Sequence, residues 1–310
     1  MKVIFMGTPD FAVGTLEALV DAGHEIVLCV TQPDKPKGRH GSKMEPPAVK
    51  VAAMAHEIPV YQPVRIRELE HVSYVTGIAA DVIVVAAFGQ ILPKEILDHP
   101  KYCCVNVHAS LLPKYRGASP IQWAVINGEK ETGVTTMRMD VGLDTGDMIQ
   151  TARVPLDPEE TGGSLFDKLA TVGGKLCVET LAAIEQGSAT YTPQDESQAT
   201  YTKMIKKSLG EIDFSKSAKE LDCLIRGLNP WPSAFTHYEG KLLKIWKARV
   251  METDKSGVPG EVLAVGKHSL VVATGDGALE LLEVQLEGKK RMDITGFLNG
   301  VSISEGAHFA

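Results

Sequence analysis

The chain has 310 residues, of which 44% are hydrophobic and 23% are charged, and its formal net charge is −7. This composition is typical of a globular protein with a sizeable core and excludes an intrinsically disordered chain. No stretch approaches the roughly 18 consecutive apolar residues that a membrane-spanning helix requires, so the sequence does not predict a membrane protein. The length allows two domains of about 100–200 residues each.

The amino-terminal part of the chain begins with a strand–helix–strand pattern. Residues 2–6 predict a buried parallel strand and are too few for the apolar core of a signal peptide. Residues 11–22 have apolar side chains at helical spacing, and residues 25–31 predict a second strand. The intervening turn lacks the Gly-x-Gly-x-x-Gly pattern, and its Pro9 has no N–H to donate to a pyrophosphate. We therefore predict a Rossmann-like α/β domain without a dinucleotide site.

Residues 33–47 form a segment with four prolines and two glycines, a composition that predicts a loop without regular structure. Its four basic side chains, at Lys35, Lys37, Arg39 and Lys43, outnumber its two acidic ones. A solvated connector would explain this composition. Contact with a nucleic-acid backbone would explain it as well, because basic side chains neutralise phosphates and long loops in compact domains often carry a function.

Two further buried strands are predicted at residues 81–89 and 102–108, and the loops that follow them would meet at one edge of a parallel sheet. Ile91 and Leu92 follow the first of these strands and either line a pocket for a flat apolar ring or pack under the next helix. Asn106 and His108 lie two residues apart on the second strand and therefore share a face. Taken alone, these two residues are better explained by a turn cap at Asn106 and a core histidine at His108 than by catalysis.

The segment 140–147 contains three aspartates and two glycines. It lacks the spacing and the closing glutamate of an EF-hand, so a catalytic carboxylate is the sharper alternative to a simple turn. An aspartate bonded to one imidazole nitrogen would leave the other nitrogen of His108 free to donate to an oxyanion, with Asn106 as a second donor. Since the chain has no common nucleophile, phosphate-loop or zinc-protease motif, this set suits acyl transfer to a nucleophile that the substrate supplies.

The carboxy-terminal part has a different character. A helix is predicted from residue 164 to about 186, and we expect the first domain to comprise residues 1–187. Residues 188–206 are polar and predict a linker, whereas residues 207–310 contain a helix and short β-type runs typical of a small OB-like barrel. Residues 203–310 hold 15 basic and 14 acidic side chains, against 17 and 25 in the rest. This asymmetry fits a less acidic domain that binds a polyanion.

The five cysteines include no Cys-x-x-Cys pair, and three of them lie in apolar runs. This pattern predicts reduced, structural thiols in a cytoplasmic protein and argues against a zinc site. No sequence feature indicates self-association, so we expect a monomer.

Four segments together resemble a known enzyme family. In order and spacing they are similar to the formyltransferases that use 10-formyltetrahydrofolate, and the resemblance extends over essentially the whole chain. The segments are 7–12 (Gly-Thr-Pro-Asp-Phe-Ala), 106–108 (Asn-Val-His), 110–117 (Ser-Leu-Leu-Pro-Lys-Tyr-Arg-Gly) and 140–147 (Asp-Val-Gly-Leu-Asp-Thr-Gly-Asp). Three further segments resemble the family members that act on methionyl-tRNA. They are the basic segment, 229–232 (Asn-Pro-Trp-Pro) and 273–277 (Ala-Thr-Gly-Asp-Gly).

The resemblance implies roles for individual residues. It identifies Asn106, His108 and Asp144 with the family's catalytic residues. It implies a folate-binding segment formed by Ser110, Leu111, Leu112 and Pro113. We expect Ile91 and Leu92, the apolar pair that follows residues 81–89, to add a wall to this folate site. It also implies that basic side chains meet the acceptor end of tRNA, foremost Arg39 and then Lys35, Lys37 and Lys43. No metal is implied.

The expected reaction is attack by the α-amine of initiator methionyl-tRNA on the formyl carbon of 10-formyltetrahydrofolate, which gives N-formylmethionyl-tRNA for translation initiation. One alternative is transfer to a small amine, such as a nucleotide sugar or glycinamide ribonucleotide. Another is a non-catalytic tRNA- or nucleotide-binding protein with a Rossmann-like core. The basic segment and the region 203–310 favour the tRNA substrate.

Overall fold

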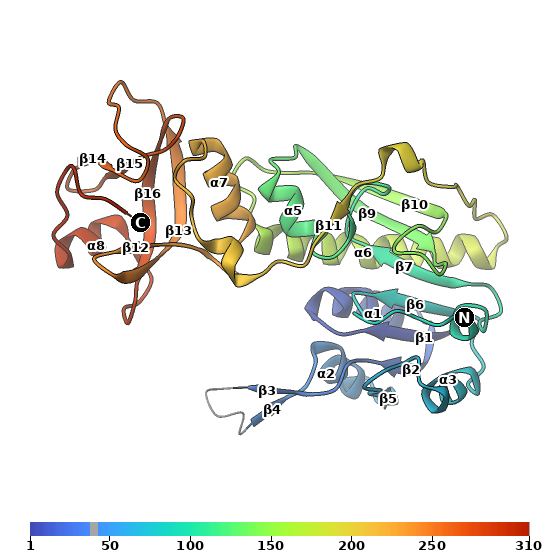
Figure 1. The fold of residues 1–310 in the computed structure, drawn as a ribbon. Coiled ribbons are helices and arrows are strands. Elements are labelled where there is room, and N and C mark those ends of the chain that lie inside the picture. The colour runs from blue at the N-terminus through green and yellow to red at the C-terminus, as the bar shows by residue number, and fades with distance from the viewer. Residues whose placement is uncertain (38–42, 310) are drawn as a thin grey trace. The chain divides into compact units, whose positions relative to one another are not determined.

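The computed structural model describes residues 1–37 and 43–309, so Arg39 lies outside the described residues. The chain forms two compact units (Figure 1). The first unit comprises residues 1–117, 131–155 and 166–202, and the second comprises residues 118–130, 156–165 and 203–310. Two short segments from the middle of the sequence therefore fold with the carboxy-terminal part.

The first unit is built on a seven-stranded sheet of order β10-β9-β7-β6-β1-β2-β5. Its strands are β1 (Lys2–Gly7), β2 (Glu25–Val30), β5 (Val60–Tyr61), β6 (Val82–Ala86), β7 (Cys104–His108), β9 (Glu131–Arg138) and β10 (Met148–Pro155). The neighbouring strands β5, β2, β1, β6 and β7 pair in parallel. Strand β9 pairs antiparallel with β7, and β10 pairs antiparallel with β9. The predicted mostly parallel α/β sheet is confirmed. Its strand order reverses direction at β1, and in such sheets ligands bind at the carboxyl edge near this point.

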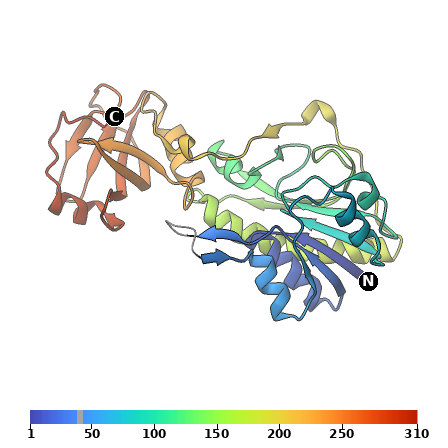
Figure 2. The same cartoon turned by 60° about the horizontal axis from the view of Figure 1, so that its bottom comes forward.

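Helices cover both faces of this sheet (Figure 2). On one face, α3 (Leu69–Thr76) and α4 (Lys94–Leu97) pack on a core cluster that includes side chains of β1, β2, β6 and β7. On the other, α1 (Asp10–Asp21) lies against α2 (Ala48–Ala55) and against α6 (Gly162–Glu185). The α1–α6 approach depends on glycine, because a Cβ at Gly174 would lie 2.6 Å from the carbonyl oxygen of Gly14.

The basic segment contains a hairpin of β3 (Lys35–Lys37) and β4 (Lys43–Glu45), visible as the two short blue arrows in Figure 1. The prediction that its prolines exclude regular structure is therefore wrong. In a two-stranded ribbon both strands are edges, so Pro36 can occupy a position that needs no N–H donor. In the backbone register of the hairpin, Lys35 lies opposite Glu45 and Lys37 lies opposite Lys43.

Residues 188–202, which the sequence suggested as part of a linker, belong to the first unit. They contain the short helix η1 (Glu196–Gln198) and strand β11 (Tyr201–Thr202). Strand β11 pairs in parallel with β8 (Arg116–Gly117), so this polar segment is fixed beside the residues that follow β7. Its polar side chains are used for hydrogen bonds, which explains why its composition resembles that of a solvated linker.

The second unit is an antiparallel β domain with helices. Its sheet has the order β12-β13-β16-β15-β14, with β17 added to β16. Its elements are α5 (Pro120–Ile126), η2 (Lys207–Gly210), α7 (Ala218–Gly227), β12 (Ala234–Tyr238), β13 (Lys241–Met251), β14 (Val262–Val265), β15 (Leu270–Ala273), β16 (Ala278–Leu286), β17 (Met292–Asp293) and α8 (Ile294–Gly300). Helix α7 begins with the capping box of Ser217 and Glu220. Within the described ranges, no helix has the length and apolarity needed to span a membrane.

Candidate active site

Strand β7 positions Asn106 and His108. It lies between β6 and β9 in the sheet, and its side chains alternate between the two faces. Val107 points to the α6 side, where its Cγ1 approaches Gly173. Asn106 and His108 point to the opposite face, and both are largely buried, at 8% and 7% exposure. The predicted common orientation of the two side chains is confirmed, because both reach the same carboxylate.

That carboxylate belongs to Asp144. Its Oδ1 accepts a hydrogen bond from Asn106 Nδ2 at 3.4 Å, and its Oδ2 lies 3.7 Å from His108 Nδ1. Oδ2 also accepts the backbone N–H of Gly117 at 2.8 Å. Asp144 has a φ of +54°, a left-handed conformation that is uncommon outside glycine and persists only where surrounding contacts hold it.

The other two aspartates of the segment have different partners. Asp140 Oδ1 accepts from the backbone N–H of Gly142 and the hydroxyl of Thr145, which shapes the turn. Asp147 forms an ion pair with Arg138. The residue types alone left open which aspartate faces the imidazole. The structure brings Asp144 there, the aspartate that the family resemblance implied.

The second imidazole nitrogen of His108 is also occupied. Nε2 lies 2.9 Å from the carbonyl oxygen of Tyr115, and a carbonyl can only accept, so Nε2 carries a proton. The prediction that the nitrogen away from the aspartate is free for an oxyanion is therefore wrong, because the chain folds back at Tyr115 and places a carbonyl there. When His108 is neutral, Nδ1 is an acceptor. When it is protonated, Nδ1–H is the donor next to Asp144, and the carboxylate balances the charge.

The segment 110–113 forms the turn after β7. The Ser110 hydroxyl donates to the carbonyl of Lys114 at 2.7 Å. The Thr135 hydroxyl of β9 donates to the Ser110 carbonyl and accepts the N–H of Leu112. Ser110 and Leu112 are buried, whereas Leu111 and Pro113 are half-buried. The buried side chains hold the turn, so a ligand would meet mainly the backbone and the other two side chains.

The two apolar residues after β6, Ile91 and Leu92, differ in the burial of their side chains. Leu92 is buried in the cluster with α3 and α4, as expected for a residue that packs under a helix. Ile91 is 81% exposed and is the one of this pair whose side chain is accessible to a ligand.

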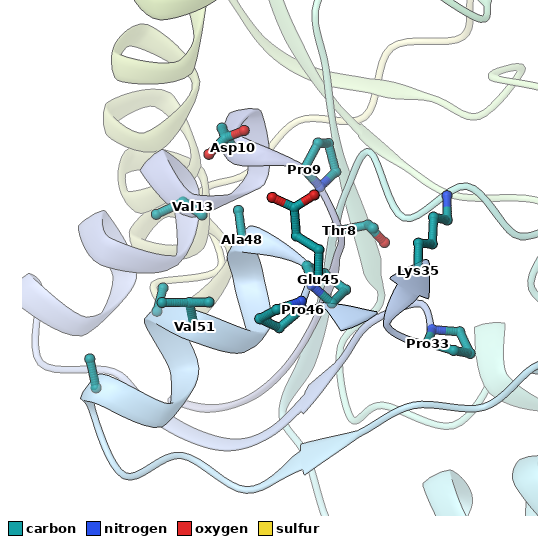
Figure 3. Close-up of a pocket in the computed structure, with 13 residues that line it drawn as sticks. Thr8, Pro9, Asp10, Val13, Pro33, Lys35, Glu45, Pro46, Ala48 and Val51 are labelled. Carbon is teal, nitrogen blue, oxygen red and sulfur yellow. The ribbon is translucent and has the colours of Figure 1, made fainter. Parts of the chain in front are cut away.

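A pocket lies at the carboxyl ends of β1 and β2, where Figure 3 shows Lys35 and Glu45 of the hairpin beside it. Its wall is mainly apolar and is completed by the starts of α1 and α2 through Pro9, Val13, Ala48 and Val51. Only β6 separates β1 from β7 in the sheet, so the carboxyl ends of β1 and β7 lie at the same edge, with the two strands roughly 10 Å apart. The pocket lies on the side of the sheet covered by α1 and α2, whereas His108 points to the opposite face.

The five cysteines are free and buried, which confirms the predicted unpaired thiols. Burial raises the pKa of Cys29 and of Cys177 to about 12. Such thiols stay protonated at neutral pH and are poor nucleophiles. The site therefore offers hydrogen-bond donors and a carboxylate, and these suit a reaction in which the attacking atom comes from the substrate.

Comparison with known proteins identifies the family. Residues 1–181 match the family model described as "Formyl transferase", and residues 204–302 match "Formyl transferase, C-terminal domain". The chain belongs to the formyltransferase family. The resemblance drawn from its segments is thereby confirmed.

This formyltransferase has close relatives of the same length. It is 61% identical over 309 residues to a protein of Agathobacter rectalis named methionyl-tRNA formyltransferase, covering 100% of this chain and 99% of the relative. It is 57% identical over 311 residues to a protein of the same name from Lachnospira eligens, covering 99% and 98%.

Solved structures share the fold at lower identity. One is an N-formyltransferase of Helicobacter canadensis in complex with folinic acid and dTDP-3-aminofucose, with a TM-score of 0.67, 19% identity, and coverage of 91% of this chain and 98% of that one. Another is HypX of Aquifex aeolicus in complex with tetrahydrofolic acid, with a TM-score of 0.65, 19% identity, and coverage of 97% and 48%. At these identities the likeness concerns the fold alone.

The sequence-based interpretation missed the backbone partners of the site. His108 is fixed by the carbonyl of Tyr115, and Asp144 by the N–H of Gly117. Every residue offers such groups, so they leave no signal in the residue types. Thr135 and Gln194, whose side chains also bond to backbone near the site, lie in segments that composition describes as an ordinary strand and a linker.

Proposed function

We propose that this formyltransferase transfers the formyl group of 10-formyltetrahydrofolate to the α-amine of initiator methionyl-tRNA. The observation that carries the proposal is the 61% identity, over the full length of both chains, to a methionyl-tRNA formyltransferase. Matches to both formyltransferase family models support it, as does the grouping of Asn106, His108 and Asp144. The product, N-formylmethionyl-tRNA, serves translation initiation.

In the proposed reaction, the amine nitrogen attacks the formyl carbon and a tetrahedral oxyanion forms. Asn106 Nδ2 uses one hydrogen on Asp144 and has a second hydrogen for the oxyanion. Protonated His108 donates from Nδ1, since Nε2 is held by the Tyr115 carbonyl. The C–N10 bond then breaks. The amine loses a proton and N10 gains one, and we assign Asp144 to relay this proton through water.

The folate side of the site is proposed to comprise the segment 110–113 and Ile91. The high exposure of Ile91 supports contact with a flat ring, while the buried Leu92 would support this wall from below. The proposed reaction assigns no step to a metal ion, because hydrogen-bond donors on Asn106 and His108 stabilise the charge that develops on the oxyanion.

The tRNA side is proposed to comprise the hairpin and the second unit. Lys35 borders the pocket of Figure 3, and we assign Lys35, Lys37, Arg39 and Lys43 to the acceptor end of the tRNA. We further propose that the antiparallel sheet of the second unit closes as an OB-like barrel that holds the tRNA backbone. We also propose that the enzyme is a monomer and acts in the cytoplasm.

The deciding experiment measures formyl transfer from 10-formyltetrahydrofolate to charged tRNA, with initiator and elongator methionyl-tRNA compared at equal concentration. We expect folate-dependent formylation with preference for the initiator. The fold of sugar N-formyltransferases motivates a parallel assay with a dTDP-linked amino sugar. Turnover of the amino sugar without turnover of methionyl-tRNA would overturn the proposal, and tRNA binding without any turnover would identify a binding protein instead.

A further inference from the structure

Arg116 in β8 is a fully buried arginine with every donor used. Its Nε and Nη2 donate to Gln194 Oε1 at 3.0 and 2.9 Å, and Nη1 donates to the Tyr201 hydroxyl at 2.9 Å. The carboxylate of Glu196 accepts two more bonds, at 2.9 and 2.6 Å. A guanidinium has five N–H donors, and these contacts account for five. A buried charge is stable only when paired in this way, so Arg116 forms a rigid base for Gln194.

Gln194 has both ends of its amide engaged. Its oxygen accepts from Arg116, while its Nε2 donates to the carbonyls of Asp144 and Gly146, each at 2.8 Å. Arginine only donates and carbonyls only accept, so the partners allow a single orientation of the amide. A flipped amide would place its oxygen against two carbonyl oxygens and its NH2 against the guanidinium.

One of the two carbonyls that Gln194 holds belongs to Asp144 itself, and the other belongs to Gly146, two residues later in the same turn. The left-handed backbone of Asp144 needs such support, and its carboxylate is held separately by the N–H of Gly117. Tyr115, Arg116 and Gly117 are consecutive and supply the acceptor for His108, the base for Gln194 and the donor for Asp144. One connected set of bonds therefore fixes both His108 and Asp144.

We propose that Gln194 is a positioning residue for formyl transfer, which is held by Arg116 and acts through Asp144. The proposal rests on the proposed function, because it assumes that Asp144 takes part in the reaction. Gln194 would not touch either substrate. Its effect would therefore fall on turnover rather than on substrate binding.

The test uses Gln194→Glu in the full-length enzyme. The substitution keeps the shape and the oxygen that faces Arg116, and replaces the donor by an oxygen that faces two carbonyls. We expect kcat for methionyl-tRNA to fall about 10- to 100-fold, as displacement of a reacting group by about 1 Å can do, with KM for both substrates nearly unchanged. Gln198→Glu is the matched control, because it adds the same charge at an exposed position of the same segment and should leave kcat unchanged.

A double-mutant cycle with Asp144→Asn separates the positioning role of Gln194 from the assignment of Asp144 to the active site. Asp144→Asn alone should lower kcat, and Gln194→Glu should add little in that background, since both losses pass through one carboxylate. The positioning role would be overturned if Gln194→Glu lowered kcat by the same factor in the wild type and in Asp144→Asn. It would also be overturned if Gln194→Glu had the kcat of the wild type. Wild-type kcat in Asp144→Asn would instead overturn the assigned active site. If Gln194→Glu fails to fold by circular dichroism, Gln194→Met enters the same cycle, because it removes the donors without adding repulsion.

Discussion

At the scale of single residues, His108 carries much of the proposed mechanism. Both of its ring nitrogens have fixed surroundings, with the Tyr115 carbonyl on Nε2 and Asp144 beside Nδ1. A protonated imidazole in this position would be compensated by the carboxylate of Asp144, and its remaining donor, Nδ1–H, would lie beside the carboxylate that Asn106 Nδ2 also contacts. Two donors that converge next to one carboxylate are what a developing oxyanion and a moving proton require.

We predict that His108→Ala lowers kcat about 10²–10³-fold, because loss of one oxyanion donor costs roughly 3–4 kcal/mol. Steady-state kinetics with methionyl-tRNA measures this effect. His99→Ala is the matched control, since Nε2 of His99 likewise donates to a backbone carbonyl, that of Ile78, on a histidine outside the site. Near-normal turnover of folded His108→Ala would contradict the assignment of His108.

At the scale of elements, close helix packing supports the sheet. Helices α1 and α6 meet where glycines let their backbones approach, and the strands that end at the site lie on this support. Added volume at such a contact forces the helices apart, because backbone atoms cannot move aside as flexible side chains can.

We predict that Gly174→Ala destabilises the enzyme by about 1–3 kcal/mol, because its Cβ would meet the carbonyl oxygen of Gly14 at 2.6 Å. Urea unfolding followed by circular dichroism measures this loss. Gly300→Ala in α8 is the control: its Cβ would meet nothing within 4 Å, and alanine favours helix, so stability should hold or rise slightly. Equal stability of the two variants would contradict the tight α1–α6 contact.

The hairpin is anchored by an aspartate at its base. Asp34 Oδ1 accepts from Gln62 Nε2 at 2.8 Å and from Lys50 Nζ at 2.9 Å. These hydrogen bonds, that of Gln62 first, hold the pKa of Asp34 below its usual value. A carboxylate whose pKa is lower in the folded state contributes stability that is present above its unfolded pKa and is lost as the pH falls through its folded pKa.

We therefore predict that Asp34→Asn lowers the Tm at neutral pH by a few degrees or less, and that the difference from the wild type disappears in acid. Thermal unfolding at a series of pH values from neutral to strongly acidic measures this. A difference in Tm that stays constant across the series would show that the carboxylate charge is not what anchors the hairpin.

At the scale of the whole molecule, the chain combines a catalytic sheet with surfaces proposed for a large polyanionic substrate. The overall charge is negative, so tRNA must be met by local basic groups rather than by the net field of the protein. The hairpin residues lie next to the carboxyl ends of β1 and β2, at the edge of the sheet that also carries His108.

We predict that Lys35→Ala and Arg39→Ala each raise KM for methionyl-tRNA. Each lost phosphate contact should also make the slope of log binding constant against log salt concentration shallower by about one. Titrations at several salt concentrations measure the slope. Lys101→Ala removes the same charge at the opposite edge of the sheet, just before β7, and should change neither quantity. Unchanged salt slopes in the two hairpin variants would remove the hairpin from the tRNA site.

The linear order of residues was enough to predict the alternation of buried strands and helices, the common face of Asn106 and His108, and the formyltransferase family. These features are local, since side-chain periodicity reports which face of an element is buried and motif order survives in the linear chain. The tertiary structure was needed to show that the Tyr115 carbonyl occupies the second nitrogen of His108. It also decided that Gln194, in a segment with the composition of a linker, holds the turn of Asp144. These contacts join positions up to 50 residues apart and largely involve backbone groups, which are the same in every residue and so leave no trace in the sequence.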